Sequence, residues 1–181
     1  MSPLLQWRGP VYMTAGFAGV IALALLLVQP LLIGGWLPGL RALRARRIHR
    51  WVGAGLVVAV VLHVGGLWLT SPPDVVDALL FRSPTPFSDW GVVAMWAAFA
   101  AALLAVCRRR LKLSPQAWRA GHMTLAITVV VGTAVHAVLI QGTMETVTKA
   151  ALCGLVLLAT GRLAFDLWSR RRRGASRPEP S

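Results

Sequence analysis

Five long apolar stretches limit what this chain can fold into. They cover residues 12–33, 49–69, 90–107, 119–140 and 147–168. A helix needs about 20 residues to cross the hydrocarbon core of a bilayer, and each stretch reaches or approaches that length. The strands of a membrane barrel would be shorter and would alternate in polarity, which these stretches do not. The sequence therefore predicts an all-α, polytopic membrane bundle with five transmembrane helices.

Little of the chain remains outside these spans, so we expect a single domain. Of the 181 residues, 56% are hydrophobic and only 14% are charged, which is typical of a membrane protein. We expect a transmembrane domain over residues 1–169 and a basic, disordered tail over residues 170–181. Tryptophans favour membrane interfaces, and most of those in this chain flank the predicted spans. These are Trp7, Trp36, Trp51, Trp68, Trp90, Trp118 and Trp168.

The net charge of +13 would suit a nucleic-acid-binding protein, but its distribution follows the predicted spans instead. Basic residues gather between the first and second spans, between the third and fourth, and after the middle of the fifth. Only Arg8, Arg82 and Lys149 fall on the other side. Positively charged loops stay in the cytoplasm. This pattern predicts an N-terminus outside, a C-terminus in the cytoplasm, a location in the cell inner (plasma) membrane, and no nucleic-acid partner.

The longest external segment, residues 71–89, has proline pairs on both sides of an amphipathic stretch. Its aliphatic side chains would share one side of a helix and its aspartates the other. We expect a short helix at the outer interface, which would be a plain connector, a lid for the outer end of the bundle or a docking site for a partner.

The four histidines form two pairs with equal spacing. His49 and His63 are fourteen residues apart, and so are His122 and His136. Fourteen residues of helix rise about 21 Å and turn through about 1400°, which is within about 40° of four full turns. Each pair therefore lies on one face of a span, near opposite ends. The second and fourth spans run in the same direction, so we expect His49 to face His122 at an inner level and His63 to face His136 at an outer level.

Several roles for these histidines can be compared. An ionisable side chain within a span is costly and usually functional, although a single histidine can simply form a hydrogen bond between helices. A proton relay would need carboxylates nearby, and the spans contain only Asp166, near one end. A zinc site needs three or four ligands around one point. Two stacked six-coordinate haems, each held between two imidazoles, fit the pattern best.

Other residues near the histidines agree with this hypothesis. Gly53 and Gly132 lie four residues from a histidine on the same helix face, where a missing side chain leaves room for a flat macrocycle. Close packing of helices through small residues is the alternative explanation. The arginines at the inner level are candidates to pair with haem propionates, although membrane topology already accounts for them. They are Arg46, Arg47, Arg50 and Arg119. No catalytic residue is assigned.

The segments RRIHRWVGAGLVVAVVLHV and GHMTLAITVVVGTAVHAVL resemble the haem-binding helices of the ferric reductase-like transmembrane domain superfamily. This superfamily includes ferric reductases, NADPH oxidases and the haem-bearing membrane subunit of a bacterial methionine sulfoxide reductase system. The resemblance implies two b-type haems, ligated by His49 and His122 at the inner level and by His63 and His136 at the outer level. It also implies that electrons flow outward from the cytoplasmic side.

The chain also departs from the larger members of this superfamily. They have six spans and a cytoplasmic flavin and nicotinamide domain, whereas this sequence predicts five spans and contains no Gly-rich dinucleotide motif. We therefore expect the electron donor to be a separate cytoplasmic flavin reductase or a membrane quinol. The acceptor outside is open among ferric chelates, oxygen and a periplasmic oxidoreductase.

The sequence leaves three hypotheses about function open. The first is a transmembrane electron conduit that acts as the electron-transfer subunit of an oxidoreductase. The second is a quinol-linked cytochrome b subunit of a periplasmic oxidoreductase. The third is a haem-free transporter or assembly module with the same topology, in which the histidines form hydrogen bonds between helices.

Overall fold

The computed structural model describes residues 8–141 and 144–175, and in these residues it contains helices and no strand. The helices are α1 (Pro10–Gly34), α2 (Ala42–Thr70), α3 (Pro72–Leu79), α4 (Pro86–Cys107), α5 (Pro115–Leu139) and α6 (Thr146–Ala175). All but α3 are long and apolar enough to cross a membrane. The predicted all-α bundle with five spans is confirmed, and the short α3 lies within residues 71–89, where the sequence predicts a short helix.

Proline and glycine set several helix boundaries. Helices α1, α3, α4 and α5 begin with a proline, which has no N–H to leave unpaired in the first turn. The Ser114 hydroxyl also accepts a hydrogen bond from the N–H of Ala117 at 3.2 Å and so caps α5. Helix α1 ends at Gly35, whose φ of 72° is a left-handed conformation that glycine adopts without strain.

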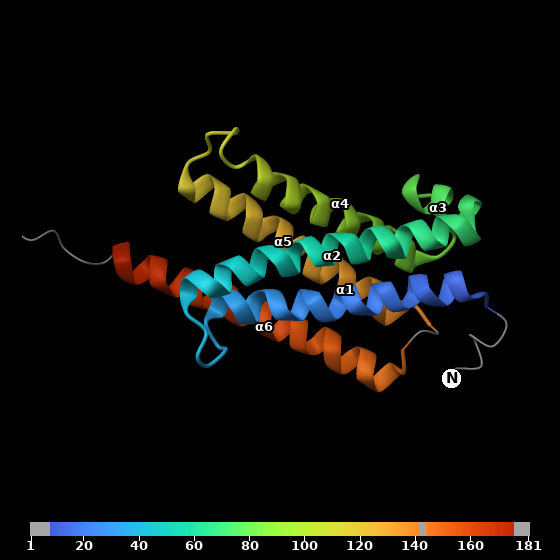
Figure 1. Ribbon diagram of the computed structural model, residues 1–181, viewed down its shortest axis with the longest axis horizontal. Helices are drawn as coiled ribbons and strands as arrows, with labels where there is room; N and C mark the ends of the chain where they lie inside the picture. The colour runs from blue at the N-terminus through green and yellow to red at the C-terminus, as the bar shows by residue number, and fades with distance from the viewer. Residues whose placement is uncertain (1–7, 142–143, 176–181) are drawn as a thin grey trace, which may run out of the picture.

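The long helices form two hairpins and a fifth helix that joins them (Figure 1). Helix α1 packs along α2, α4 packs along α5, and α6 contacts both α1 and α5. The α1–α2 loop, the α4–α5 loop and the C-terminal part of α6 lie at one end of the bundle, and α3 lies at the other (Figure 1). We call the first the arginine-rich end, because the basic loops meet there, and the second the α3 end.

An apolar core joins the two hairpins between these ends. It contains Leu23 and Leu26 of α1, Leu56 of α2, Val129 of α5 and Val156 of α6. One stripe of α6 is buried, with residues at the three- and four-residue spacing of a packed helix face. This stripe consists of Lys149, Cys153, Val156, Thr160 and Leu163. The buried Lys149 ammonium donates to the carbonyl of Ile140, just beyond α5, and so connects α6 to the end of α5.

Helix α6 extends further than the sequence analysis anticipated. It includes residues 170–175, where a disordered tail was expected. Residues 176–181 of that tail, like Trp7 near the N-terminus, lie outside the described residues. The arginines of the last turns suit this extension, because cations near the C-terminal end of a helix interact favourably with its dipole.

Glu145 stabilises the start of α6. Its carboxylate accepts hydrogen bonds from the N–H groups of Val147 (3.0 Å) and Thr148 (2.9 Å). These bonds hold the pKa of the exposed Glu145 carboxyl below its usual value. The stabilisation is therefore present above the pKa of the unfolded chain and is lost as the pH falls through the folded pKa. We expect the protection of the Val147 and Thr148 amides to fall in acid, once exchange rates are corrected for the intrinsic pH dependence of amide exchange. Protection in Glu145→Gln should be insensitive to this titration, and a pH-dependent loss of protection that persists there would contradict the assignment.

Candidate functional site

The structure brings the four histidines together in two opposed pairs. His49 of α2 faces His122 of α5, with ring centroids 6.3 Å apart and ring planes at 73°. His63 of α2 faces His136 of α5, with centroids 6.4 Å apart and planes at 78°. The pairs are separated by fourteen residues on each helix, or about 21 Å along the bundle. The first pair lies toward the arginine-rich end and is called the inner pair, and the second lies toward the α3 end and is called the outer pair.

The spacing within each pair fits two imidazoles on opposite sides of one metal ion. Imidazole nitrogens bind metals at about 2.0–2.1 Å, and a ring nitrogen lies about 1.1 Å from the ring centre, so two such rings have centroids about 6.3 Å apart. At each level the two histidines could therefore hold one iron between them, such as the iron of a haem, which would supply one-electron chemistry.

Helices α2 and α5, which carry the histidines, are not a closely packed pair. Each packs closely against its own hairpin partner instead, and α2 is the least covered of the five long helices. All four histidines are half-buried. Within residues 8–141 and 144–175, no three His, Cys, Asp or Glu side chains come together. Each level thus offers two side-chain ligands, which is fewer than a structural zinc site uses.

The outer pair is held by backbone carbonyls of the neighbouring helices. Nδ1 of His63 lies 2.8 Å from the carbonyl oxygen of Ala15 on α1. Nδ1 of His136 lies 2.8 Å from the carbonyl oxygen of Phe87 on α4. A carbonyl can only accept, so each Nδ1 carries the proton and donates it. The unprotonated nitrogen is then Nε2, which is the atom available to a metal.

The inner pair has the same arrangement with less well-formed hydrogen bonds. Backbone groups of Gln29 and Ala101 interact with the rings of His49 and His122. Both Nδ1 atoms are buried, but neither forms a hydrogen bond of good geometry. Gln29 follows Ala15 by fourteen residues and Ala101 follows Phe87 by fourteen, the same interval as between the histidines. The backbone groups of α1 and α4 that face the histidines are therefore spaced like the histidines of α2 and α5.

Trp118 adds a stacking partner at the inner level. Its ring lies parallel to that of His122, with centroids 5.3 Å apart and planes at 8°. The Arg108 guanidinium lies over the Trp118 ring, 4.3 Å from its centroid. The indole Nε1 is buried and has no hydrogen-bond partner. The sequence placed Trp118 in the interfacial belt, but its side chain contacts a candidate ligand directly.

The two glycines proposed from the sequence face their hairpin partners. A Cβ on Gly53 would lie 3.2 Å from the Gln29 side chain on α1. A Cβ on Gly132 would lie 3.0 Å from the carbonyl oxygen of Trp90 and 3.1 Å from the Cβ of Ala94, both on α4. Both glycines thus permit close packing within a hairpin. That they leave room for a macrocycle stays a prediction.

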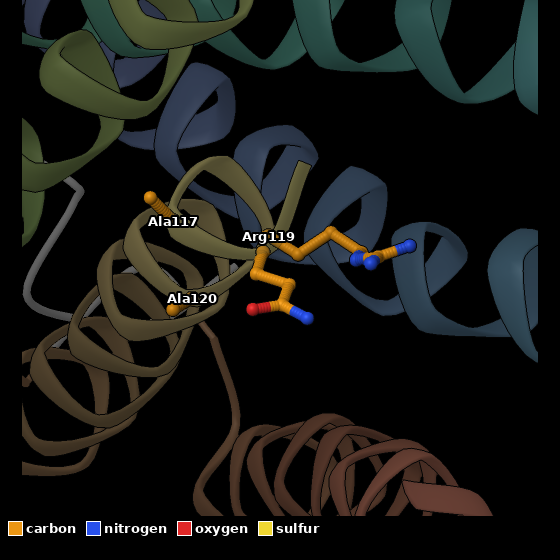
Figure 2. Close-up of a pocket in the computed structure, with 4 residues that line it drawn as sticks. Ala117, Arg119 and Ala120 are labelled. Carbon is orange, nitrogen blue, oxygen red and sulfur yellow. The ribbon is translucent and has the colours of Figure 1, made fainter. Parts of the chain in front are cut away.

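An open surface pocket lies at the start of α5, at the arginine-rich end. Its lining residues are Gln116, Ala117, Arg119 and Ala120, all from this one helix. Figure 2 shows the Arg119 side chain extending away from α5, toward the space beside the bundle. Arg119 is three residues before His122. The pocket contains one charged side chain and the amide of Gln116, so it supports only the prediction that Arg119 can reach an anionic group at the inner level.

The family of the chain follows from a comparison with protein-family profiles. The profile described as ferric reductase like transmembrane component matches residues 12–133. The chain belongs to this family. The match includes His49, His63 and His122 and ends three residues before His136. Membership of the ferric reductase-like family indicates transmembrane electron transfer. Neither the curated proteins nor the solved structures that were compared gave a match.

Sequence reasoning found the histidines but missed the groups around them. The ferric reductase-like chain uses carbonyls of Ala15 and Phe87 to orient the outer pair, and a carbonyl is present in every residue. One indication was nevertheless present in the residue spacing. Ala15 and Phe87 are 72 residues apart, nearly the 73-residue offset between His63 and His136. Aligning the two hairpins on their histidines therefore brings these two positions within one residue of each other.

Proposed function

We propose that this chain carries electrons across the plasma membrane by holding two b-type haems in its bundle. His49 and His122 would hold the inner haem, and His63 and His136 the outer one. The observation that carries the proposal is the pair of centroid distances, 6.3 Å and 6.4 Å, at two levels of the same two helices. A haem supplies a one-electron iron couple, and the protein sets its ligands, spacing and surroundings.

The residues around the two histidine levels suit an electron path that is insulated from water. Leu56 of α2 and Val129 of α5 are buried in the core between the histidine levels. Residues 51–62 of α2 and 123–135 of α5, which lie between the histidine levels, contain no charged side chain. The surrounding apolar medium lowers the local dielectric and keeps water away from the ligands, which helps to set the redox potential.

We further propose that the arginine-rich end faces the cytoplasm, because basic loops are retained there. Electrons would then enter near His49 and His122 and leave near the α3 end. Four arginines at the inner level would offer charge-assisted hydrogen bonds to propionates. They are Arg46, Arg47, Arg50 and Arg119. The buried, unpaired Nε1 of Trp118 is a further donor at this level.

The donor would be a cytoplasmic flavin reductase or a quinol, and the acceptor would lie outside the membrane. Reduction of the purified protein by a quinol analogue, with no flavoprotein present, would identify the quinol and favour a quinol-linked cytochrome b subunit. Reduction only by a reduced flavoprotein would favour the flavin route.

The proposal can be tested in vesicles that enclose ferricyanide and carry the purified protein. A reduced flavin that cannot cross the membrane is added outside, and the loss of enclosed ferricyanide is followed by its absorbance. We expect reduction that depends on the protein and on its haem content. Protein that contains both haems but reduces no more ferricyanide than empty vesicles would contradict electron transfer across the membrane.

Replacing Trp118 should have a smaller effect, confined to the inner level. Trp118→Leu removes the stacked ring from His122, and aromatic pairs of this kind contribute about 0.5–1.5 kcal/mol. We expect inner haem to be retained about 2- to 10-fold more weakly, as measured by transfer of haem to an excess of apomyoglobin. Trp118→Phe keeps a ring but loses Nε1, so its difference from wild type isolates the hydrogen-bond donor and its difference from Trp118→Leu isolates the ring. Equal retention in all three proteins would show that Trp118 does not support the ligand.

A further inference from the structure

The outer histidines rest against two glycines on the neighbouring helices. Gly19 of α1 is four residues after Ala15, whose carbonyl accepts from His63. A Cβ built on Gly19 would lie 3.0 Å from Nδ1 and 3.2 Å from Cε1 of His63. The imidazole therefore occupies the space that a side chain at position 19 would need.

The second hairpin has the same contact, and it is tighter. Gly91 of α4 is four residues after Phe87, whose carbonyl accepts from His136. A Cβ on Gly91 would lie 2.7 Å from Nδ1 and 2.9 Å from Cε1 of His136. The Phe87 ring also meets that imidazole edge to face, with centroids 5.8 Å apart and planes at 66°.

In both hairpins the acceptor carbonyl and the glycine belong to one helical turn. A ring that approaches this carbonyl from the side must pass over the residue four positions later. At the inner level, the corresponding residues after Gln29 and Ala101 are Ile33 and Ala105, which both carry side chains. The inner rings interact with the backbone of Gln29 and Ala101, but their Nδ1 atoms form no hydrogen bond of good geometry. The glycine and the well-formed hydrogen bond thus occur together at the outer level, and neither occurs at the inner level.

We propose that Gly19 and Gly91 are positioning residues of the outer haem site. Each lets an imidazole lie against the helix so that Nδ1–H donates to the carbonyl and Nε2 is directed at the iron. The hydrogen bond fixes the tautomer and ring orientation and raises the basicity of the ligand. This inference rests on the proposed function, and it adds that the outer ligands are held rigidly by paired glycine turns that the inner ligands lack.

The test compares Gly19→Ala and Gly91→Ala in the full chain. Gly65→Ala on α2 and Gly154→Ala on α6 are matched controls, because a Cβ at either position meets no atom within 4 Å. The readout is the low-spin ferric EPR spectrum, which depends on the orientation of the axial imidazoles, together with haem per chain. The outer signal is assigned as the one that His63→Ala removes.

We expect the outer signal to shift or disappear in Gly19→Ala and Gly91→Ala while the inner signal is unchanged. Gly91→Ala should have the larger effect, because its contact is closer. The controls should match wild type. The inner signal reports in the same sample that the bundle has folded, and Gly19→Ala serves as the milder variant if Gly91→Ala does not accumulate.

Two outcomes would overturn the inference. One is an outer signal that both alanine variants leave unchanged, and the other is an equal change at the two levels, which would indicate general loss of helix packing. Either outcome leaves the proposed function intact if wild-type protein contains two haems. Wild-type protein without haem would instead remove the proposed function itself.

Discussion

Replacing His63 with alanine should remove the outer haem and stop electron transfer across the membrane. His63 supplies one of only two side chains that face each other at that level, 6.4 Å apart between ring centroids. Its loss leaves His136 opposite a cavity, while His49 and His122 keep their arrangement about 21 Å away. We expect haem content to fall from about two to about one per chain. Ferricyanide reduction in vesicles should fall to the level of empty vesicles.

Replacing the partner of His63 tests whether this effect belongs to the outer level as a whole. His136→Ala should reproduce His63→Ala, because both histidines belong to the outer level. The remaining inner haem should still be reduced by the donor on the arginine-rich side. Transfer at the wild-type rate in His63→Ala would show that electrons do not use the outer level, and the conduit hypothesis would then be wrong.

Replacing His122 should produce the opposite pattern. We expect His122→Ala to lose the inner haem and keep the outer one, because His63 and His136 hold their hydrogen bonds to Ala15 and Phe87 independently of it. In spheroplasts, a reductant that cannot cross the membrane should reduce the remaining haem from outside. The physiological donor inside the cell should no longer reduce it.

His49→Ala is the matched control for this second prediction, since His49 faces His122 at 6.3 Å. It should give the same spectrum and the same one-sided reduction. The orientation of the protein is tested at the same time. Reduction of the remaining haem from the inside only would mean that the arginine-rich end faces outward, contrary to the positive-inside rule.

Much of this arrangement could be predicted from the sequence because it is periodic. The apolar stretches are long enough to specify helices in a bilayer, and the fourteen-residue histidine spacing places each pair on one helix face. These two facts, with the parallel direction of α2 and α5, are enough to pair His49 with His122 and His63 with His136. The structure has those pairs.

The parts that could not be predicted depend on groups without a sequence signature. The acceptors for the outer histidines are main-chain oxygens, which any residue in place of Ala15 or Phe87 would also provide. Trp118 reads as an interfacial tryptophan because its stacking on His122 depends on a side-chain rotamer. Gly53 and Gly132 were identified by their distance from histidines along the helix. Which neighbour each one faces was decided by the packing within the hairpins.

The most direct test of the central claim is a pyridine haemochrome assay on the purified chain, with a reduced-minus-oxidised spectrum. Two b-type haems per chain with low-spin bands are the predicted result, because each of the two levels presents two opposed imidazoles. Protein that contains no haem after expression in haem-sufficient cells would contradict the account. The histidines would then have to be interpreted as hydrogen-bonding residues of a haem-free membrane module.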